Sequence, residues 1–294
     1  MSLLPQSGGR PYEVLLVGDS VDGVKDALLA DVEGLPQSEP SFDVSAIPAS
    51  RYGQAVWLAR AIVVVKTDGN LYTATRIRYE KDVHASPQMV VYVNSPSASA
   101  LRRDMPRLGG KLRELLTRFE INAEMENLSL RSNPKSERLV EETMGWSVKV
   151  PVDMASHKQG RDFVWLSNNA PAGMQNLCVY ALPLHPLSLS WLVSARDSVM
   201  KRNLPGERDG MYVQTVAPTV EAKAVTEAGK RRVIVRGLWE MKGDAMGGPF
   251  VAHVLADSAN GRYVVAEAFV YAPESAKRNR MRQTEAALYT LKKP

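Results

Sequence analysis

The sequence is poor in the residues that most often build disulfides and metal sites. It contains one cysteine, Cys178, and four histidines, His84, His157, His185 and His253. A single thiol forms no internal disulfide and supplies no multi-thiolate zinc site. The histidines show neither His-x-His nor His-Glu-x-x-His spacing, so we expect no metal. Cys178 lies in an apolar, strand-like run, which predicts a buried and unreactive thiol.

Long apolar runs and the common catalytic motifs are also missing. No segment approaches the roughly 18 unbroken apolar residues of a membrane span, and the mean hydropathy is -0.21. The sequence has no Gly-x-Ser-x-Gly elbow and no Walker loop, and its glycines at 243–248 do not form a Gly-x-Gly-x-x-Gly phosphate fingerprint. We therefore predict no catalytic residue and no cofactor. With 45% hydrophobic and 23% charged residues, the composition is that of a soluble globular protein.

The charge is only mildly basic, with a net value of +5. Nucleic-acid-binding proteins usually concentrate their basic residues on one face, but here they are spread along the chain, so we expect no nucleic-acid partner. The densest cluster is Lys277, Arg278, Arg280 and Arg282. It is typical of the solvated face of a helix, and an anionic surface such as lipid headgroups is the alternative.

The first half of the chain alternates short apolar runs with helical patterns. Asp68-Gly69 predicts a tight hairpin between two strands, and Pro106 with Gly109-Gly110 predicts a break or kink in a long helix near 106. Asn133-Pro134 predicts a helix start and Gly145 its end. The expected strands are 12–18, 42–44, 59–66, 71–79 and 88–94, and the expected helices are 21–32, 97–131 and 134–144.

The second half is richer in strands. Two turn signals, Ala228-Gly229 and Asn260-Gly261, join strands of an expected antiparallel meander. The expected strands are 146–150, 162–168, 175–183, 211–216, 219–226, 231–242, 249–257 and 262–271, and the expected helices are 187–202 and 274–291.

These patterns predict an α+β fold of two lobes, with largely antiparallel sheets and helices packed on one face. We expect a tether or cloning remnant at 1–10, an N-terminal α+β lobe at 11–131 and a C-terminal α+β lobe at 132–294 with the meander and a closing helix. Both halves end with a strand, a proline and a basic helix. This similarity suggests a worn duplication, although strand–proline–helix is also a common local solution.

The densest polar segment runs from 236 to 250. Strand alternation places Arg236, Glu240 and Lys242 on one face, with Trp239 on the other, and Asp244 follows in a glycine-rich loop. One interpretation is a ligand site, and the other is a ladder of exposed ion pairs with a wide turn.

A second candidate ligand site lies in the loop at 203–210. There Arg208 and Asp209 have the chemistry to hold a carboxylate or a phosphate, although Pro205-Gly206 and Asp209-Gly210 also fit plain turns. We therefore expect any ligand to be held by the polar residues of one or both segments.

Several motifs resemble an uncharacterised family of Bacteroidetes cell-envelope lipoproteins, classed as a domain of unknown function. They include Asp-Val-His-Ala-Ser-Pro-Gln-Met at 82–89, Arg-Asp-Ser-Val-Met-Lys at 196–201, Gly-Met-Tyr at 210–212 and the whole segment 236–250. Further matches lie at 4–14 and 271–289, so the resemblance covers nearly the whole chain. It implies a lipid-anchored envelope protein, and it carries over no catalytic residue.

The beginning of the chain bears on this resemblance. Residues 1–10 show neither a basic nor an apolar signal region, which fits a cytosolic protein or a sequence trimmed of its signal. The polar, Gly/Ser-rich start favours trimming. We therefore expect a non-catalytic envelope lipoprotein that binds an envelope protein or a small ligand, or has a structural role. The alternative is a hydrolase or transferase that uses Arg236, Glu240 and Asp244.

Overall fold

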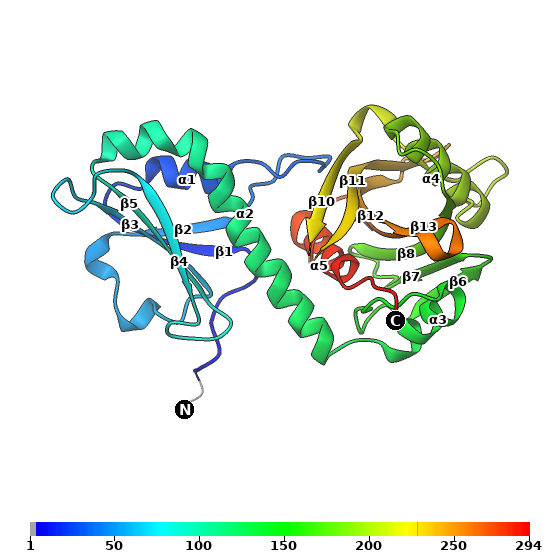
Figure 1. The fold of residues 1–294 in the computed structure, drawn as a ribbon, viewed down its shortest axis with the longest axis horizontal. Coiled ribbons are helices and arrows are strands. Elements are labelled where there is room, and N and C mark those ends of the chain that lie inside the picture. Colours follow the sequence, from blue (N-terminus) through cyan, green and yellow to red (C-terminus); the bar gives the residue numbers. More distant parts are fainter. Residues whose placement is uncertain (1–3, 228) are drawn as a thin grey trace. The chain divides into compact units, whose positions relative to one another are not determined.

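The computed structural model describes residues 4–227 and 229–294, so the expected turn at Ala228 lies outside the described residues. The chain forms two compact units, each with its own sheet (Figure 1). The first unit holds residues up to Val32 and Glu39–Ala123, and the second holds Glu33–Ser38 and Glu124–Pro294. The predicted α+β class and two-lobe organisation are therefore confirmed.

The first unit is built on a mixed five-stranded sheet in the order β2-β1-β3-β5-β4. Three neighbouring pairs are parallel, and only β4 runs antiparallel to β5. The largely antiparallel pairing that we expected is therefore found in the other sheet, while this sheet is mixed. The strands are Glu13–Val17 (β1), Asp43–Ile47 (β2), Ala61–Thr67 (β3), Arg76–Lys81 (β4) and Met89–Ser95 (β5).

The predicted hairpin at Asp68-Gly69 is wrong. Asp68 does form a turn, because its carboxylate accepts hydrogen bonds from the backbone amides of Asn70 and Leu71 at 2.8 and 3.3 Å. However, β5 lies between β3 and β4, so the chain crosses over to the far side of β5 before it pairs. The residues at 68–71 determine the turn itself. Which strand lies next to β3 is determined by burial of the apolar strands β3 and β5 against each other.

Two helices, α1 (Asp22–Leu29) and α2 (Ala98–Leu130), pack on one face of the first sheet. The other face carries a smaller apolar cluster and two short 3-10 helices, Ala49–Arg51 and Gln54–Val56. The expected break at Pro106 is absent, because an apolar stripe holds α2 on the sheet on both sides of the proline. That stripe consists of Leu101, Met105, Leu108, Leu112 and Leu116.

Part of the expected tether is bound to the first unit. Residues 5–9 run beside two loops, with the Gly8 amide donating to the Leu58 carbonyl at 2.7 Å and the Ser7 amide donating to the Ser86 carbonyl at 3.3 Å. This segment therefore forms an ordered edge of the unit. Residues 1–3 of the expected tether lie outside the described residues.

The second unit is built on an antiparallel sheet with the path β10-β11-β12-β13-β8-β7-β6, to which β9 adds by pairing with β11. The hairpin at Asn260-Gly261 is confirmed, with Gly261 in the left-handed region at φ 62°. The strands are Ser156–Gly160 (β6), Phe163–Ser167 (β7), Met174–Pro183 (β8), Val213–Thr215 (β9), Glu221–Glu227 (β10), Lys230–Met241 (β11), Gly247–Asp257 (β12) and Arg262–Tyr271 (β13). Since the two sheets differ in strand order and direction, the structure favours the common local strand–proline–helix solution over the suggested duplication.

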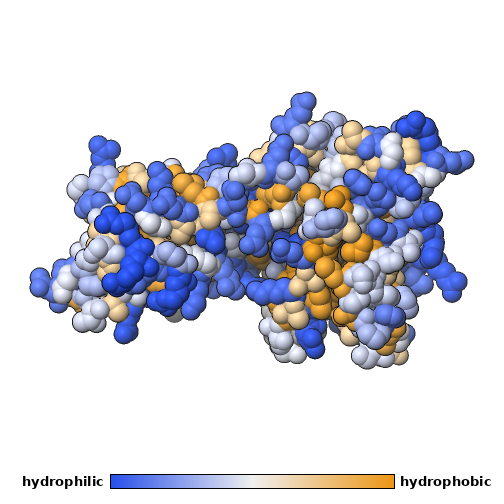
Figure 2. Space-filling model, turned by 90° about the horizontal axis from the view of Figure 1, so that it is seen from above, coloured by the Kyte–Doolittle hydropathy of each residue, from blue (hydrophilic) through white to orange (hydrophobic). Residues whose placement is uncertain are grey.

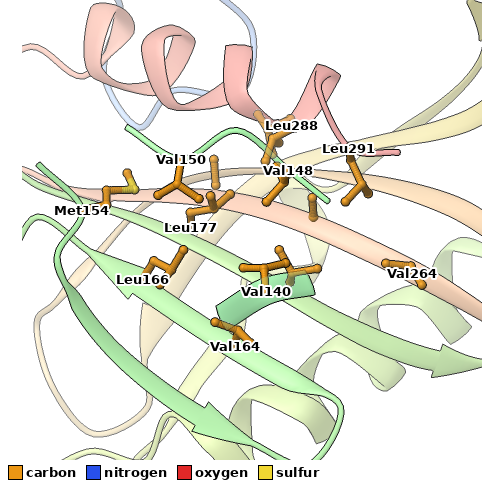
Figure 3. Close-up of a cluster of buried hydrophobic side chains, with 14 of the residues drawn as sticks. Val140, Val148, Val150, Met154, Val164, Leu166, Leu177, Val264, Leu288 and Leu291 are labelled. Carbon is orange, nitrogen blue, oxygen red and sulfur yellow. The ribbon is translucent and has the colours of Figure 1, made fainter. Parts of the chain in front are cut away.

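Helices cover both faces of this second sheet, contrary to the expected single face. Along β13, Val264 points into the cluster with α3 (Pro134–Met144) and α5 (Arg278–Tyr289), and Val265 points into the cluster with α4 (Leu189–Asn203). Figure 3 shows Leu288 and Leu291 among the side chains of the first of these clusters. Both faces of the central strands are therefore core, which their nearly continuous apolar sequences require.

Local signals set the bounds of α3 as predicted. The Asn133 side chain accepts a hydrogen bond from the Ser136 amide at 3.2 Å, Pro134 opens the helix, and Gly145 ends it at φ 68°. The expected strand at 146–150 is an extended segment with one isolated bridge, Ser147 to Lys292. Among the residues the structure describes, no helix combines the length and the apolar character needed to cross a bilayer.

Candidate functional site

The structure separates Arg236 from the other residues of the first predicted site. Its guanidinium forms a two-pronged ion pair with the buried Glu285 of α5, one contact being 3.1 Å from Nη1 to Oε2. Burial works against the charged guanidinium, but Glu285 more than offsets it and raises the pKa of Arg236. Arg236 therefore fastens α5 to the sheet.

Trp239 lies in the core on the opposite face, as predicted, with 3% of its surface exposed. Its indole nitrogen donates to the Val270 carbonyl at 3.2 Å. Gly248 makes this approach possible, since a Cβ there would lie 2.0 Å from the same carbonyl oxygen. The tryptophan and the glycine of this segment thus have a packing role.

The remaining polar residues of the segment lie at the exposed end of β11, each with its own partner. Glu240 accepts a hydrogen bond from the Gln214 side chain at 2.6 Å. The Lys242 ammonium lies 5.5 Å from the centre of the Tyr212 ring. Asp244 accepts from the next backbone amide at 2.6 Å, which is the contact of a turn residue.

The two predicted loops do meet. The Arg208 guanidinium donates to the Gly243 carbonyl at 3.4 Å, and the Lys242 amide donates to the Tyr212 carbonyl at 2.9 Å. Asp209 lies exposed in the same loop. Arg208, Asp209, Glu240, Lys242 and Asp244 therefore share one exposed corner of the second unit, whose turns hold one another in place.

Two buried charged residues of the second unit, Arg196 and Glu267, form a separate cluster beneath α4. Arg196 and Glu267 are 4% and 0% exposed, and the Arg196 guanidinium donates to both oxygens of Glu267 at 2.7–3.1 Å. Tyr180 donates to Glu267 at 2.8 Å, and Arg196 donates to Thr215 at 2.8 Å. The guanidinium also lies 4.2 Å from the centre of the Phe250 ring.

This cluster is closed by its own hydrogen bonds. Burial disfavours a charged Arg196, yet the neighbouring Glu267 outweighs it and raises the pKa of Arg196. Burial is also the main reason that the pKa of Tyr180 lies well above its usual value. Such a network fixes the position of α4 over the sheet and offers no free group to a substrate.

Sequence analysis missed this cluster, although two signals pointed to it. After its first residue, Arg262, the apolar strand β13 contains a single charged residue, Glu267. Arg196 lies on the buried face of α4, one turn after Leu192 and one turn before Met200. A single charged residue in a buried strand predicts an oppositely charged partner elsewhere in the core, and so does one on a buried helix face, because each needs a partner away from water.

Another buried carboxylate, Asp257, holds the end of the chain. It accepts hydrogen bonds from the side chains of Trp146, Asn260, Arg262 and Lys293 at 2.7–3.2 Å. Burial by itself would raise the pKa of Asp257, but these donors outweigh it and bring the pKa below its usual range. This carboxylate has a structural role.

The space between α4 and the sheet is almost filled. A cavity of about 20 Å³ lies among Leu182, Leu192, Val193, Val220 and Phe250, with Arg196 at one wall. This is room for about one water molecule. The interior of the second unit therefore has no chamber for a substrate at this place.

The most unusual surface of the second unit is the segment that joins β8 to α4, residues 183–191, which we call the leucine segment. Positions 183–190 are all exposed, including Leu184 at 48%, Leu187 at 40% and Leu189 at 42%. No Asp, Glu, Lys or Arg occurs from 183 to 195. Figure 2 shows apolar side chains gathered on the surface of this unit among hydrophilic ones.

Aromatic contacts hold the leucine segment in this exposed conformation. The His185 ring stacks on Trp191 at 4.9 Å between centroids, and Trp191 packs at 6.2 Å from Tyr263. The Tyr263 hydroxyl donates to the His185 carbonyl at 3.0 Å. Within residues 4–227 and 229–294, no group of three or more His, Cys, Asp or Glu residues is arranged to hold a metal ion.

Fold and site together define a two-unit α+β protein whose buried charges are structural. Residues 133–290 match a family model described as "Domain of unknown function (DUF4837)". Because this match spans more than half of the chain, the protein belongs to that family. Residues 7–129 match a second model, "Domain of unknown function (DUF8532)". The expected membership of an uncharacterised family is confirmed.

The other comparisons add little. No curated protein matches the chain. Among solved structures, the Ran-binding protein Mog1p of Saccharomyces cerevisiae has a TM-score of 0.34 and 11% identity over 51% of this chain and 90% of its own. A point mutant of Mog1 has a TM-score of 0.31 with the same identity and coverage. A similarity of this size carries no functional argument.

Proposed function

We propose that the protein is a non-catalytic cell-envelope lipoprotein that binds a partner protein through the leucine segment. The observation that carries the proposal is the exposure of three leucines within six residues, in a stretch of the chain without charged residues. Soluble proteins seldom keep contiguous apolar surface in water without a use for it.

The rigidity of the segment supports binding. A flexible loop would fold its leucines back onto the protein, whereas the contacts among His185, Trp191 and Tyr263 keep this one extended. Pro183 and Pro186 restrict its backbone further. A surface that is ordered before binding loses less conformational entropy when a partner docks.

The lipid anchor rests on the resemblance to envelope lipoproteins and on the polar start of the chain. An anchored protein acts next to the membrane, where its partners are other envelope proteins. The gene supplies the first check, because a lipoprotein signal with a lipidation cysteine should precede Leu4. Mass spectrometry of the native protein should then find the acyl groups, and a native protein that begins at Met1 without acyl groups would contradict the anchor.

The geometry does not favour the hydrolase or transferase alternative. That reaction needs Arg236, Glu240 and Asp244 to converge, but Arg236 is held by Glu285 on α5 while Asp244 caps an exposed turn. The exposed corner with Arg208 and Lys242 remains a candidate for a small anionic ligand.

Affinity purification of the lipidated protein from native envelopes tests the proposed partner. Leu187→Asp places a charge in the middle of the leucine segment, and Leu71→Asp is the matched control, because Leu71 is 68% exposed on the first unit. We expect a partner protein that is recovered with the wild type and with Leu71→Asp but not with Leu187→Asp. In a direct binding assay, the purified partner should likewise bind the wild type and Leu71→Asp but not Leu187→Asp. Equal recovery with both variants would refute the proposed surface.

A further inference from the structure

The first unit has a polar groove that no function yet uses. It runs along the seam between α1 and α2 and has a volume of about 490 Å³. Pockets for small ligands commonly measure about 300–1,000 Å³. The groove belongs entirely to the first unit, so its shape depends only on the packing of these two helices.

Close approach of the helices forms the floor. Gly109 of α2 packs against Ala27 of α1 so tightly that a Cβ at position 109 would lie 2.7 Å from the Ala27 Cβ. A Cβ at Gly23 would make ordinary van der Waals contact with the Met105 side chain, at 3.4 Å. Packing therefore explains the glycine at position 109.

Gly110 has no such explanation. A Cβ built at this position meets no atom within 4 Å, so packing would accept a larger residue. Glycine in the middle of a helix is destabilising, and so is Pro106 one turn earlier. Both residues line the groove, and their lack of bulk keeps it open. A residue that destabilises its helix and is not required by packing, such as Gly110, is typical of a functional site.

The two walls carry opposite charges. Asp22 and Asp26 of α1 face Arg102 and Arg107 of α2 across the groove. In the described part of the chain these four side chains form no ion pair with one another. At the C-terminal end of α1, Arg113 is held by a hydrogen bond of 2.8 Å from its guanidinium to the Ala27 carbonyl.

From this arrangement we infer that the groove binds a short peptide with free termini. The ammonium group lies at Asp22 and Asp26, and the carboxylate lies at the arginine wall, where a guanidinium offers two parallel donors. The open floor beside Pro106 and Gly110 receives the backbone and small side chains. A purely anionic ligand would be repelled by the aspartates, and a purely cationic one by the arginines.

Calorimetric titration of the full chain with trialanine tests the inference. We expect saturable binding at millimolar peptide, and no binding of trialanine that is acetylated and amidated at its ends. Gly110→Leu should weaken binding about tenfold or more while keeping or raising the melting temperature, because leucine favours the helix. Gly53→Leu is the matched control, since Gly53 also faces open space and has an extended backbone.

Two charge variants keep the test independent of Gly110. Asp26→Asn and Arg107→Gln should each weaken trialanine binding several-fold, and the loss should shrink as salt is added. Absence of trialanine binding, equal binding of the blocked peptide, or unchanged binding by Gly110→Leu would each overturn the inference. None of these outcomes affects the proposed partner surface, which lies on the second unit.

Discussion

Replacing Glu267 with glutamine removes the negative charge that holds Arg196 inside the second unit. The side chain of Glu267 is fully buried. Both of its carboxylate oxygens accept hydrogen bonds from the Arg196 guanidinium, and one also accepts from the Tyr180 hydroxyl. Glutamine has nearly the same shape, but it is neutral and offers only one acceptor oxygen. Arg196, with 4% of its surface exposed, then keeps one neutral acceptor oxygen at position 267, the Thr215 hydroxyl and the half-buried carboxylate of Asp197 as partners.

The expected loss follows from this burial. Removing one partner of a buried ion pair costs about 3–5 kcal/mol, because the other charge remains away from water. Arg196→Met should cost a similar amount by leaving Glu267 without its counter-charge. In the double variant, the loss of unfolding free energy should be smaller than the sum of the two single losses by at least about 2 kcal/mol, since neither charge is then left alone.

Urea unfolding of the four proteins measures this coupling. A loss below about 1 kcal/mol for Glu267→Gln, or strictly additive losses in the double variant, would refute the view that these charges hold α4 on the sheet.

Other predictions concern single positions. Trp239→Ala should destabilise by about 3–5 kcal/mol and Asp244→Ala by no more than about 0.5 kcal/mol in thermal or urea unfolding; a large loss for Asp244→Ala would assign it to holding the turn and end its candidacy as a ligand residue. Cys178 is fully buried, and burial raises its pKa well above the usual value, so a thiol reagent should label it only after unfolding. The lowered pKa of Asp257 means that its contribution to stability is complete above about pH 5 and is lost as the pH falls below the unfolded-state value of about 3.9; Asp257→Asn should therefore be less stable at neutral pH and less sensitive to acid. Limited proteolysis should cut first near 131–133, where α2 ends, and leave stable fragments of both units.

Signals that act within a few residues were readable from the sequence. The caps Asn133 and Gly145 bounded α3, and Asn260-Gly261 marked the turn between β12 and β13. Alternation along β11 placed Trp239 in the core. In each case the contacts that decide the conformation lie within the segment itself or follow from its apolar pattern.

Tertiary packing decided what local rules leave open. Asp68-Gly69 formed its turn, but the sheet decided the partner of β4, because the mostly buried strand β5 lies between β3 and β4. α2 stayed helical through Pro106 because the sheet holds the helix on both sides of it, although its axis bends in Figure 1. The ion pair of Arg196 with Glu267 joins residues 71 positions apart, so it exists only after α4 has docked on the sheet. The α1–α2 groove likewise depends on two helices separated by four strands in the sequence, and no pattern within either helix specifies which of its residues will face the other.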